Sequence, residues 1–96
     1  MKKKVKVIEF SGEGCANCYS LMPVLNEIMK NYNDCELLHI EITKEDMDLI
    51  AKYDIDRVPT ILVLSNDKEV GRCRGYQPEE ILSIWLDDKI EQARRK

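Results

Sequence analysis

The sequence predicts an α/β protein with the element order β-α-β-α-β-β-α, in which a four-stranded mixed sheet is flanked by three helices. Three patterns in its 96 residues support this prediction: short segments of alternating apolar and polar residues, longer segments with apolar residues at helical spacing, and a hairpin signal before the last helix. Because the first three strands alternate with helices, we expect them to pair in parallel, and we expect the final hairpin to be antiparallel. A chain of this length accommodates a single domain, which we place at residues 1–96.

The first half of the chain holds two predicted strands on either side of one helix. Residues 4–10 are rich in β-branched and aromatic side chains that alternate with polar ones, which indicates a strand. Apolar residues then recur at helical spacing from Cys15 to about Tyr32, and Pro23 lies inside this segment, where a proline is expected to kink the helix. Residues 35–42 form the second predicted strand. One face of this strand carries Leu38, Ile40 and Ile42, and the other carries Cys35, Leu37, His39 and Glu41.

The next segment predicts a short helix followed by a buried strand. Thr43, with Asp46 three residues later, is typical of an N-cap with an acid in the first helical turn, and apolar spacing continues this helix to Tyr53. Pro59 then opens residues 60–64, whose nearly continuous apolar side chains indicate a strand that is covered on both faces.

The last part of the chain predicts a hairpin and a long helix. Residues 65–68 form a turn, and residues 69–74 pair back as the second strand of the hairpin. Pro78 suits the first turn of a helix, where a missing N–H costs no hydrogen bond. The buried stripe of this helix is expected to consist of Ile81, Leu82, Trp85, Leu86 and Ile90.

Charge and composition exclude several classes of protein. The formal net charge of -3 and the sequence pI of 5.2 argue against a general nucleic-acid binder. No apolar run approaches the length of a membrane span, and no apolar core of a signal peptide follows the N-terminal lysines. We therefore expect a cytoplasmic protein without membrane contact. In that compartment, four cysteines indicate catalysis or metal binding more than structural disulfides.

The most informative motif is the pair Cys15 and Cys18 at the start of a predicted helix. Positions i and i+3 share a helix face, so the two sulfurs can form a small-ring disulfide. A helix N-terminus also stabilises a thiolate, and a dithiol that passes between thiolate, disulfide and mixed disulfide is a redox catalyst. The alternative is half of a zinc site, but zinc usually needs a second close pair. Cys35 and Cys73 stand alone and His39 is the single histidine, so the redox interpretation is favoured.

The element order, with a CxxC motif at the start of the first helix, resembles the thioredoxin superfamily. Residues 18–28, CYSLMPVLNEI, are similar to the active-site helix of that family, including the position of Pro23. Residues 53–60, YDIDRVPT, are similar to its segment ending in a cis-proline. Gly75 falls where thioredoxins carry a glycine after the last strand, and Glu9 falls where they place a buried acid.

Three departures show which branch of the superfamily the chain resembles. Only 14 residues precede Cys15, so the chain has the minimal thioredoxin fold, as in glutaredoxins and small microbial thioredoxin-like proteins. Gly14 replaces the tryptophan that thioredoxins carry before the first cysteine, which removes an aromatic wall of the substrate groove. The dipeptide between the cysteines is Ala16-Asn17, in place of Gly-Pro in thioredoxin or Pro-Tyr in many glutaredoxins, so the redox potential cannot be carried over.

The resemblance implies different roles for the two cysteines. Cys15 is the expected nucleophile, which attacks a target disulfide and forms a mixed disulfide, and Cys18 resolves it. Glu9 is expected beneath the cysteines, where a partly buried carboxylate with a raised pKa takes the proton of Cys18. The alternative for Glu9 is an outward-facing strand acid. His39 aligns with a lysine near the buried acid and can pair with Glu9 or relay protons, unless it is simply a surface residue.

The resemblance also implies a substrate groove. Pro59 is expected to follow a cis peptide bond that exposes the backbone of Val58 to an extended substrate, and an ordinary strand-starting proline is the alternative. Gly75 and Tyr76 form another wall of this groove. Gly14 borders it where the tryptophan of thioredoxins would stand.

Together these features predict a protein-disulfide reductase without a bound cofactor or metal, whose chemistry is carried by the disulfide of Cys15 and Cys18. The expected partners are disulfide-containing target proteins and a thioredoxin reductase or another dithiol donor, and we expect a monomer. Cys35 and Cys73 are expected to be buried, unreactive thiols. Two alternatives remain open: a glutaredoxin that uses glutathione, and a non-catalytic or metal-binding module on the same fold.

Overall fold

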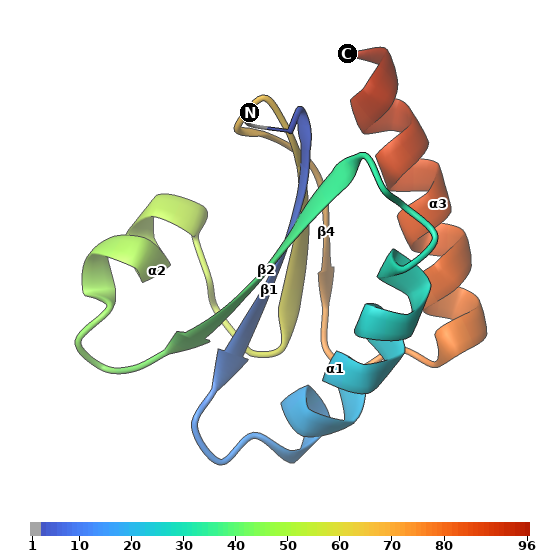
Figure 1. Ribbon diagram of the computed structural model, residues 1–96. Helices are drawn as coiled ribbons and strands as arrows, with labels where there is room; N and C mark the ends of the chain where they lie inside the picture. The colour runs from blue at the N-terminus through green and yellow to red at the C-terminus, as the bar shows by residue number, and fades with distance from the viewer. Residues whose placement is uncertain (1–2) are drawn as a thin grey trace.

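The structure, a computed structural model, describes residues 3–96 and has the predicted order of strands and helices (Figure 1). Met1 and Lys2, which begin the predicted domain, lie outside the described residues. The elements are β1 (Val5–Gly12), α1 (Ala16–Met29), β2 (Cys35–Ile42), α2 (Met47–Tyr53), β3 (Thr60–Ser65), β4 (Lys68–Arg74) and α3 (Glu79–Arg95). In this part of the chain the strands form a four-stranded mixed sheet in the order β2-β1-β3-β4, flanked by the three helices, so the predicted fold class is confirmed.

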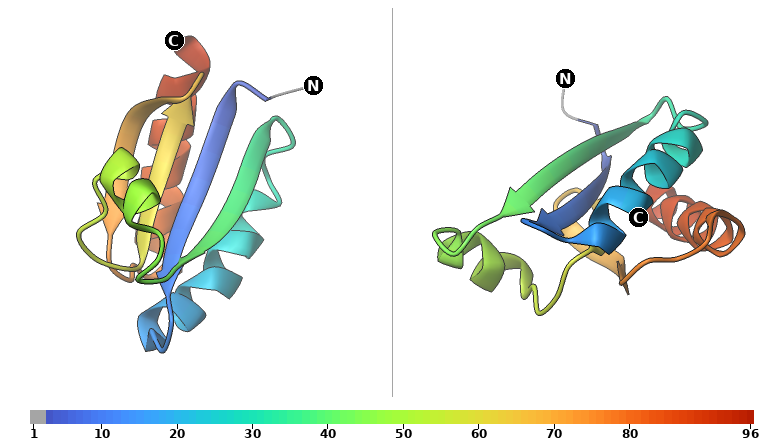
Figure 2. Two further views of the ribbon diagram at one scale, coloured as in Figure 1. Left: turned by 90° about the vertical axis from the view of Figure 1, so that its left-hand side faces the viewer. Right: turned by 90° about the horizontal axis from the view of Figure 1, so that it is seen from below.

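The sheet separates two apolar cores of unequal size. α1 and α3 cover one face, and α2 covers the other (Figure 1; Figure 2, left). Side chains of β1 alternate between the faces, so Val5 and Val7 belong to the larger core under α1 and α3, whereas Ile8 and Phe10 belong to the smaller core under α2. The same alternation turns Glu9 toward α1.

β3 runs antiparallel to β1, so the expectation that the first three strands pair in parallel is wrong for this strand. β1 pairs with β2 in parallel, but with β3 in antiparallel register, where Phe10 lies opposite Thr60. The helix in this connection, α2, is short: seven residues of helix rise about 10 Å, whereas a strand of eight residues is about 26 Å long, so α2 does not carry the chain back along the sheet. β3 therefore begins at the end where β2 stops. As a result, Pro59 lies at the same end of the sheet as Cys15.

α1 continues through its proline. The ring of Pro23 cannot donate a hydrogen bond to the carbonyl of Tyr19, yet the segment remains helical on both sides. The helix ends three residues before Tyr32, where the sequence predicted its end. The side-chain amide of Asn31 donates a hydrogen bond of 3.1 Å to the carbonyl of Ile28 and so satisfies a backbone group that the helix end leaves free.

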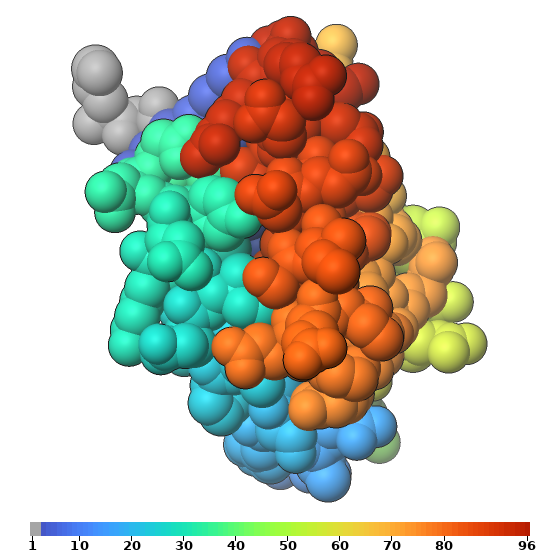
Figure 3. All heavy atoms as spheres, turned by 90° about the vertical axis from the view of Figure 1, so that its right-hand side faces the viewer, coloured from blue at the N-terminus to red at the C-terminus, as the bar shows by residue number. Residues whose placement is uncertain are grey.

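α3 packs beside α1 on the same face of the sheet (Figure 3). Trp85 is only partly buried, and Ile81 is 55% exposed, which corrects its predicted place in the buried stripe. Ile81 is turned by about 100° from Leu82 around the helix axis, on the side away from Leu86 and Ile90, so it lies outside the buried stripe. The buried residues of α3 are Leu82, Leu86, Ile90 and Ala93.

The start of α2 also differs from the prediction. Asp46 is the residue before this helix, and its carboxylate accepts hydrogen bonds from the backbone N–H (2.7 Å) and the hydroxyl (3.0 Å) of Thr43. Thr43 therefore does not cap the helix, because it donates its hydroxyl proton to an acid that bends back toward it. The acid within the first turn is Asp48.

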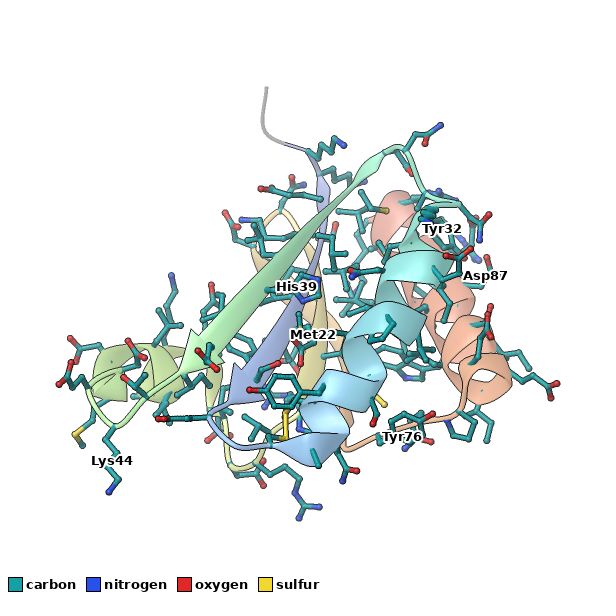
Figure 4. All side chains as sticks on the ribbon, turned by 60° about the horizontal axis from the view of Figure 1, so that its bottom comes forward. Met22, Tyr32, His39, Lys44, Tyr76 and Asp87 are labelled. Atoms are coloured by element: carbon teal, nitrogen blue, oxygen red, sulfur yellow. A yellow bond between two sulfur atoms is a disulfide. The ribbon has the colours of Figure 1, made fainter. Side chains whose placement is uncertain are left out.

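A cluster of polar side chains connects α3 with the loop before β2, at the end of the sheet away from Cys15. The hydroxyl of Tyr32 donates to Asp87 at 2.9 Å (Figure 4), and the guanidinium of Arg94 donates two hydrogen bonds of 2.8 Å to Asp34. Burial, together with the bond to Asp87, raises the pKa of Tyr32 to about 12. The hydrogen bonds from Arg94 hold the pKa of Asp34 below its usual value.

Candidate active site

The two cysteines of the CxxC motif lie at the first turn of α1. Cys15 is the residue before the helix, and its sulfur accepts a hydrogen bond of 3.2 Å from the backbone N–H of Cys18. The two residues form a disulfide with Cα atoms 5.3 Å apart, so the structure holds the oxidised pair. A backbone N–H at a helix N-terminus favours negative charge on a sulfur, which prepares Cys15 to act as a thiolate once the disulfide is reduced.

The two sulfur-bearing residues differ in exposure. Cys18 is 1% exposed, whereas Cys15 keeps part of its surface, and Ala16 and Asn17 between them are exposed. A target disulfide can therefore approach Cys15 but not Cys18. The buried thiol can react only with a disulfide that has already formed at its neighbour. The two residues of the pair thus differ in their access to a molecule outside the protein.

Glu9 is a fully buried carboxylate on β1, on the face of the sheet that α1 covers. This burial rules out the alternative of an outward-facing strand acid. The hydroxyl of Ser11, two residues later on the same face, lies 2.7 Å and 2.6 Å from the two carboxylate oxygens and donates its proton to them. A buried carboxylate needs such partners, because an unpaired charge in the core would be strongly destabilising.

His39 on β2 (Figure 4) lies opposite Glu9 in the parallel register of β1 and β2, so the register turns the two side chains to the same face of the sheet. Its Nδ1 lies 3.2 Å from Oε1 of Glu9, and its Nε2 lies 2.9 Å from Oδ1 of Asn26 on α1. The side chain of His39 is 29% exposed. The predicted pairing of His39 with Glu9 is therefore present, and the imidazole connects the buried acid to the surface of α1.

A hollow of about 240 Å³ lies between α1 and β2 and joins these groups. Cys18 and Met22 line it from the helix, and Ser11 and His39 line it from the sheet (Figure 4). Ser11 and His39 both bond the Glu9 carboxylate, so the hollow connects the hydrogen-bonding partners of the buried acid with the resolving thiol. Tyr19, Gly12, Ile40 and Glu41 complete its lining.

The loop before β3 brings two of the predicted groove residues together. The peptide bond between Val58 and Pro59 is cis. The carbonyl of Pro59 accepts a hydrogen bond of 2.8 Å from the backbone N–H of Gly75, whose φ of 86° is a conformation that glycine adopts readily. The hydroxyl of Thr60 donates a bond of 2.6 Å to the carbonyl of Arg57 and holds the loop in shape. These bonds make one surface from segments that are distant in the sequence.

Tyr76 follows Gly75 and is 40% exposed, and it lies at the same end of the molecule as the start of α1 (Figure 4). Gly14, on the other side of the cysteine pair, is exposed, and a Cβ at this position would have no neighbouring atom within 4 Å. The groove residues predicted from the sequence therefore lie around the end of the sheet where β1 stops and β3 begins.

A second hollow, of about 200 Å³, borders the Val58 loop on the α2 side of the sheet. Three isoleucines supply its apolar surface, and Asp56 and Arg57 supply charged groups beside Val58. The isoleucines are Ile42, Ile50 and Ile55.

Three residues of this site were missed by the sequence-based prediction. Gly12 lies against Val58, and Ser11 and Asn26 bond Glu9 and His39, respectively. Asn26 could have been found by helical spacing, because Cys18, Met22 and Asn26 follow one another at intervals of four residues and share a helix face. Gly12 and Ser11 carried no signal beyond a flexible turn.

The remaining cysteines lie apart from the pair. Cys35 at the start of β2 is buried, as expected, and burial is the main cause that raises the pKa of its thiol to about 11. Cys73 on β4 is only partly buried, which corrects the expectation for this thiol, although burial still raises its pKa. Among residues 3–96, no group of three or more histidine, cysteine, aspartate and glutamate side chains is arranged to hold a metal ion.

The helices of residues 3–96 include none with the length and apolar character needed to cross a membrane.

Known proteins are similar to this chain in sequence and in fold. Residues 1–88 match the family model described as thioredoxin. The thioredoxin of Staphylococcus epidermidis is 31% identical over 87 residues, which cover 90% of this chain and 83% of the relative, and a Staphylococcus aureus thioredoxin is 30% identical over the same lengths.

Two solved structures have a similar fold. One is thioredoxin-2, described as a component of malaria parasite protein secretion machinery, with a TM-score of 0.78, 24% identity, and coverage of 92% of this chain and 85% of that chain. The other is Chlamydomonas reinhardtii thioredoxin f2, with a TM-score of 0.77, 17% identity, and coverage of 92% and 82%. With its CxxC pair at the start of α1 and a family match over most of its length, this chain belongs to the thioredoxin family of thiol–disulfide oxidoreductases.

Proposed function

We propose that this chain is a protein-disulfide reductase in which Cys15 is the nucleophile and Cys18 the resolving thiol. The observation that carries the proposal is the asymmetry of the pair: Cys15 is accessible at the N-terminus of α1, and Cys18 is buried behind it. The Cys15 thiolate attacks one sulfur of a target disulfide, forms a mixed disulfide and releases the first target thiolate. Cys18 then attacks the sulfur of Cys15 and releases the second, so two electrons pass from the pair to the target.

Glu9 is the proposed acceptor of the Cys18 proton in the second step. Cys18 is buried and must lose its proton before it can attack, because the thiolate is the nucleophile. Ser11 and His39, which both bond the Glu9 carboxylate, line the same hollow as Cys18, which supports a proton transfer from the thiol to the acid by way of this hollow. His39 is a candidate relay on this route.

The proposed substrate groove runs along Val58 and Pro59. Strand pairing of β3 with its neighbours begins at Thr60, so Val58 lies beyond the paired register at the end of the sheet that carries Cys15. An extended target segment can pair with the backbone there and present its disulfide to Cys15. Gly14, Gly75 and Tyr76 are the proposed borders of the groove.

The proposed partners are disulfide-containing proteins as substrates and a thioredoxin reductase or another dithiol donor as the source of electrons. The role is assigned to one thioredoxin-like domain spanning residues 1–96. A cytoplasmic location is part of the proposal, because Cys35 and Cys73 are unpaired thiols, which suit a reducing compartment.

The decisive experiment compares two electron donors in the reduction of insulin. Activity is expected with NADPH and thioredoxin reductase, and little activity is expected with glutathione, NADPH and glutathione reductase. Cys15→Ser should abolish turnover, Cys18→Ser should accumulate a mixed disulfide with the target, and Cys73→Ser should behave like the parent protein. Activity only with glutathione would identify a glutaredoxin. A Cys15→Ser variant that still reduces insulin would contradict the assignment of Cys15 as the nucleophile.

A further inference from the structure

His39 has a hydrogen-bond acceptor at each ring nitrogen, and this limits where its protons can lie. Nδ1 lies 3.2 Å from Oε1 of Glu9, and Nε2 lies 2.9 Å from Oδ1 of Asn26. An amide oxygen and an ionised carboxylate accept hydrogen bonds but cannot donate them. With Oδ1 of Asn26 against the ring, Nε2 carries a proton, and a further proton lies between Nδ1 and the carboxyl group of Glu9, bonded to one or the other.

We propose that Asn26 is a positioning residue, which keeps a proton on Nε2 of His39 and so obliges His39 and Glu9 to share a second proton across the contact of Nδ1 with Oε1. The inference rests on the proposed role of Glu9 as the acceptor of the Cys18 proton. Without the oxygen of Asn26, neutral His39 can carry its single proton on Nδ1 and donate it to an ionised Glu9. That arrangement needs no shared proton, so Asn26 decides how many protons the pair holds.

The position of Asn26 on α1 follows from helical spacing. Cys18 and Asn26 are eight residues apart and lie on one face of the helix, which faces β2 across the hollow beside Cys18. The amide of Asn26 meets the imidazole of His39 there at 2.9 Å. A single helix face thus presents both the thiol that must lose a proton and the amide that fixes the protons of His39.

The other groups around His39 do not replace Asn26 as an acceptor for Nε2. Ser11 on β1 directs its hydroxyl to both oxygens of Glu9. The remaining ionisable side chains that line the hollow, among the described residues, are Cys18 and Tyr19 from α1 and Glu41 from β2. The imidazole forms its hydrogen bonds with Glu9 and Asn26.

The shared proton sets a condition for the resolving step. In that step the S–H bond of Cys18 breaks, its proton passes to an oxygen of Glu9, and the new thiolate attacks the sulfur of Cys15 and expels the target thiolate. The shared proton makes the carboxylate of Glu9 a weaker base, so Glu9 accepts the proton of Cys18 most readily after the shared proton has left for solvent, and the expelled thiolate takes up one proton from solvent. The rate of resolution should therefore rise with pH until the shared proton has been lost.

The first test is to determine which ring nitrogen of His39 carries a proton, by NMR of the reduced protein labelled with ¹⁵N in its single histidine. In the parent protein, the neutral imidazole is expected to carry its proton on Nε2. Asn26→Asp keeps an oxygen that can only accept and should give the same spectrum. In Asn26→Leu, the neutral imidazole should carry its proton mainly on Nδ1. Glu27→Leu is the matched control, because the Glu27 carboxylate is exposed and bonds Lys30.

The second test measures the resolving step directly. The reduced protein, with Cys35→Ala and Cys73→Ser in parent and variants so that the CxxC pair alone can react, is mixed with a dithiobis(nitrobenzoate) probe, and the second coloured thiolate released per protein reports the attack by Cys18. Asn26→Leu should resolve about threefold or more faster than the parent near pH 6 and at an equal rate near pH 9, whereas Asn26→Asp should follow the parent.

Three results would overturn the proposal. The first is a parent protein whose neutral His39 carries its proton on Nδ1, since the amide of Asn26 would then be the donor. The second is an Asn26→Leu spectrum identical to that of the parent. The third is that all spectra are as expected, but Asn26→Leu and the parent protein resolve the mixed disulfide at equal rates at both pH values. Failure of the proposed role of Glu9 is distinguishable, because Glu9→Gln would then resolve at the parent rate while the parent spectrum still shows a protonated Nε2.

Discussion

Gly12 lies directly against the side chain of Val58. A Cβ atom at Gly12 would come within 2.8 Å of Cγ2 of Val58, a distance that real Cβ contacts essentially never reach. The carbonyl of Gly12 also accepts a hydrogen bond of 3.3 Å from the backbone N–H of Cys15. The end of β1 therefore connects the loop of the nucleophile to the loop before Pro59, and the missing side chain of Gly12 lets the two loops approach.

Gly12→Ala should displace Val58 and weaken target reduction. The added methyl group overlaps a branched side chain next to the backbone, so the variant should lose about 1–3 kcal/mol of unfolding free energy, as other over-packed sites do. The KM for insulin reduction should rise, because the proposed groove changes shape. Urea unfolding and steady-state kinetics measure the two effects. Gly71→Ala is the control, since its Cβ would meet the flexible side chain of Lys89 at 2.8 Å and can displace it easily.

Glu9→Gln should slow the resolving step while leaving the first attack unchanged. An amide cannot take the proton of Cys18, so resolution should fall by about 10²-fold, which is the lower range of general-base contributions. Stopped-flow release of the two probe thiolates separates the steps. Glu41→Gln also lies at the hollow but on the exposed side, and it should leave both rates unaltered. Equal resolution by Glu9→Gln and the parent at neutral pH would remove Glu9 from the mechanism.

The ion pair of Asp34 with Arg94 should stabilise the protein at neutral pH, and this stabilisation should be lost in acid. The folded pKa of Asp34 is lower than its unfolded pKa, chiefly because Arg94 donates hydrogen bonds to it. The contribution is therefore present above the unfolded pKa near 4 and is lost as pH falls below that value. Arg94→Gln should lower the free energy of unfolding only slightly at neutral pH, since the pair is exposed, and should not change it in strong acid. Urea unfolding of parent and variant across this pH range tests the prediction.

Stability should fall at alkaline pH because Cys35 holds its proton more tightly in the folded protein. Its folded pKa of about 11 lies above the ordinary value of 9.0. Stability is therefore fully present below the unfolded pKa and falls as pH rises from there through the folded pKa. Cys35→Ala should flatten this part of the pH profile. Tyr32, whose pKa is about 12, should cause a further fall in stability at higher pH. This further fall should also occur in Cys35→Ala.

The spacing of apolar residues predicted the helices and strands of this fold well, because this spacing is a property of each segment by itself. The two faces of residues 35–42 are as expected: Leu38, Ile40 and Ile42 pack under α2, while Cys35 and Leu37 join the larger core. The direction of β3 could not be read in this way. It depends on how far α2 carries the chain relative to the length of the sheet, which is a property of two elements together.

The same holds for the candidate site: features within one segment could be predicted, and contacts between distant segments could not. The CxxC pair at the helix start and the acid six residues before Cys15 were visible in the sequence. The contacts that complete the site join segments that are distant in the chain, such as Asn26 with His39 and Pro59 with Gly75. Their geometry depends on where α1 and β4 dock against the sheet, and a single sequence carries no direct record of that docking.

The short α2 leaves a connection that starts and ends at one rim of the sheet, between Ile42 and Pro59. Residues added to or exchanged in this connection would alter the surface beside Val58, including the second hollow, without changing the order of the strands. If the proposed groove is correct, this segment is where the surface presented to a target can be redesigned while Cys15, Cys18, Glu9 and the sheet beneath them stay the same.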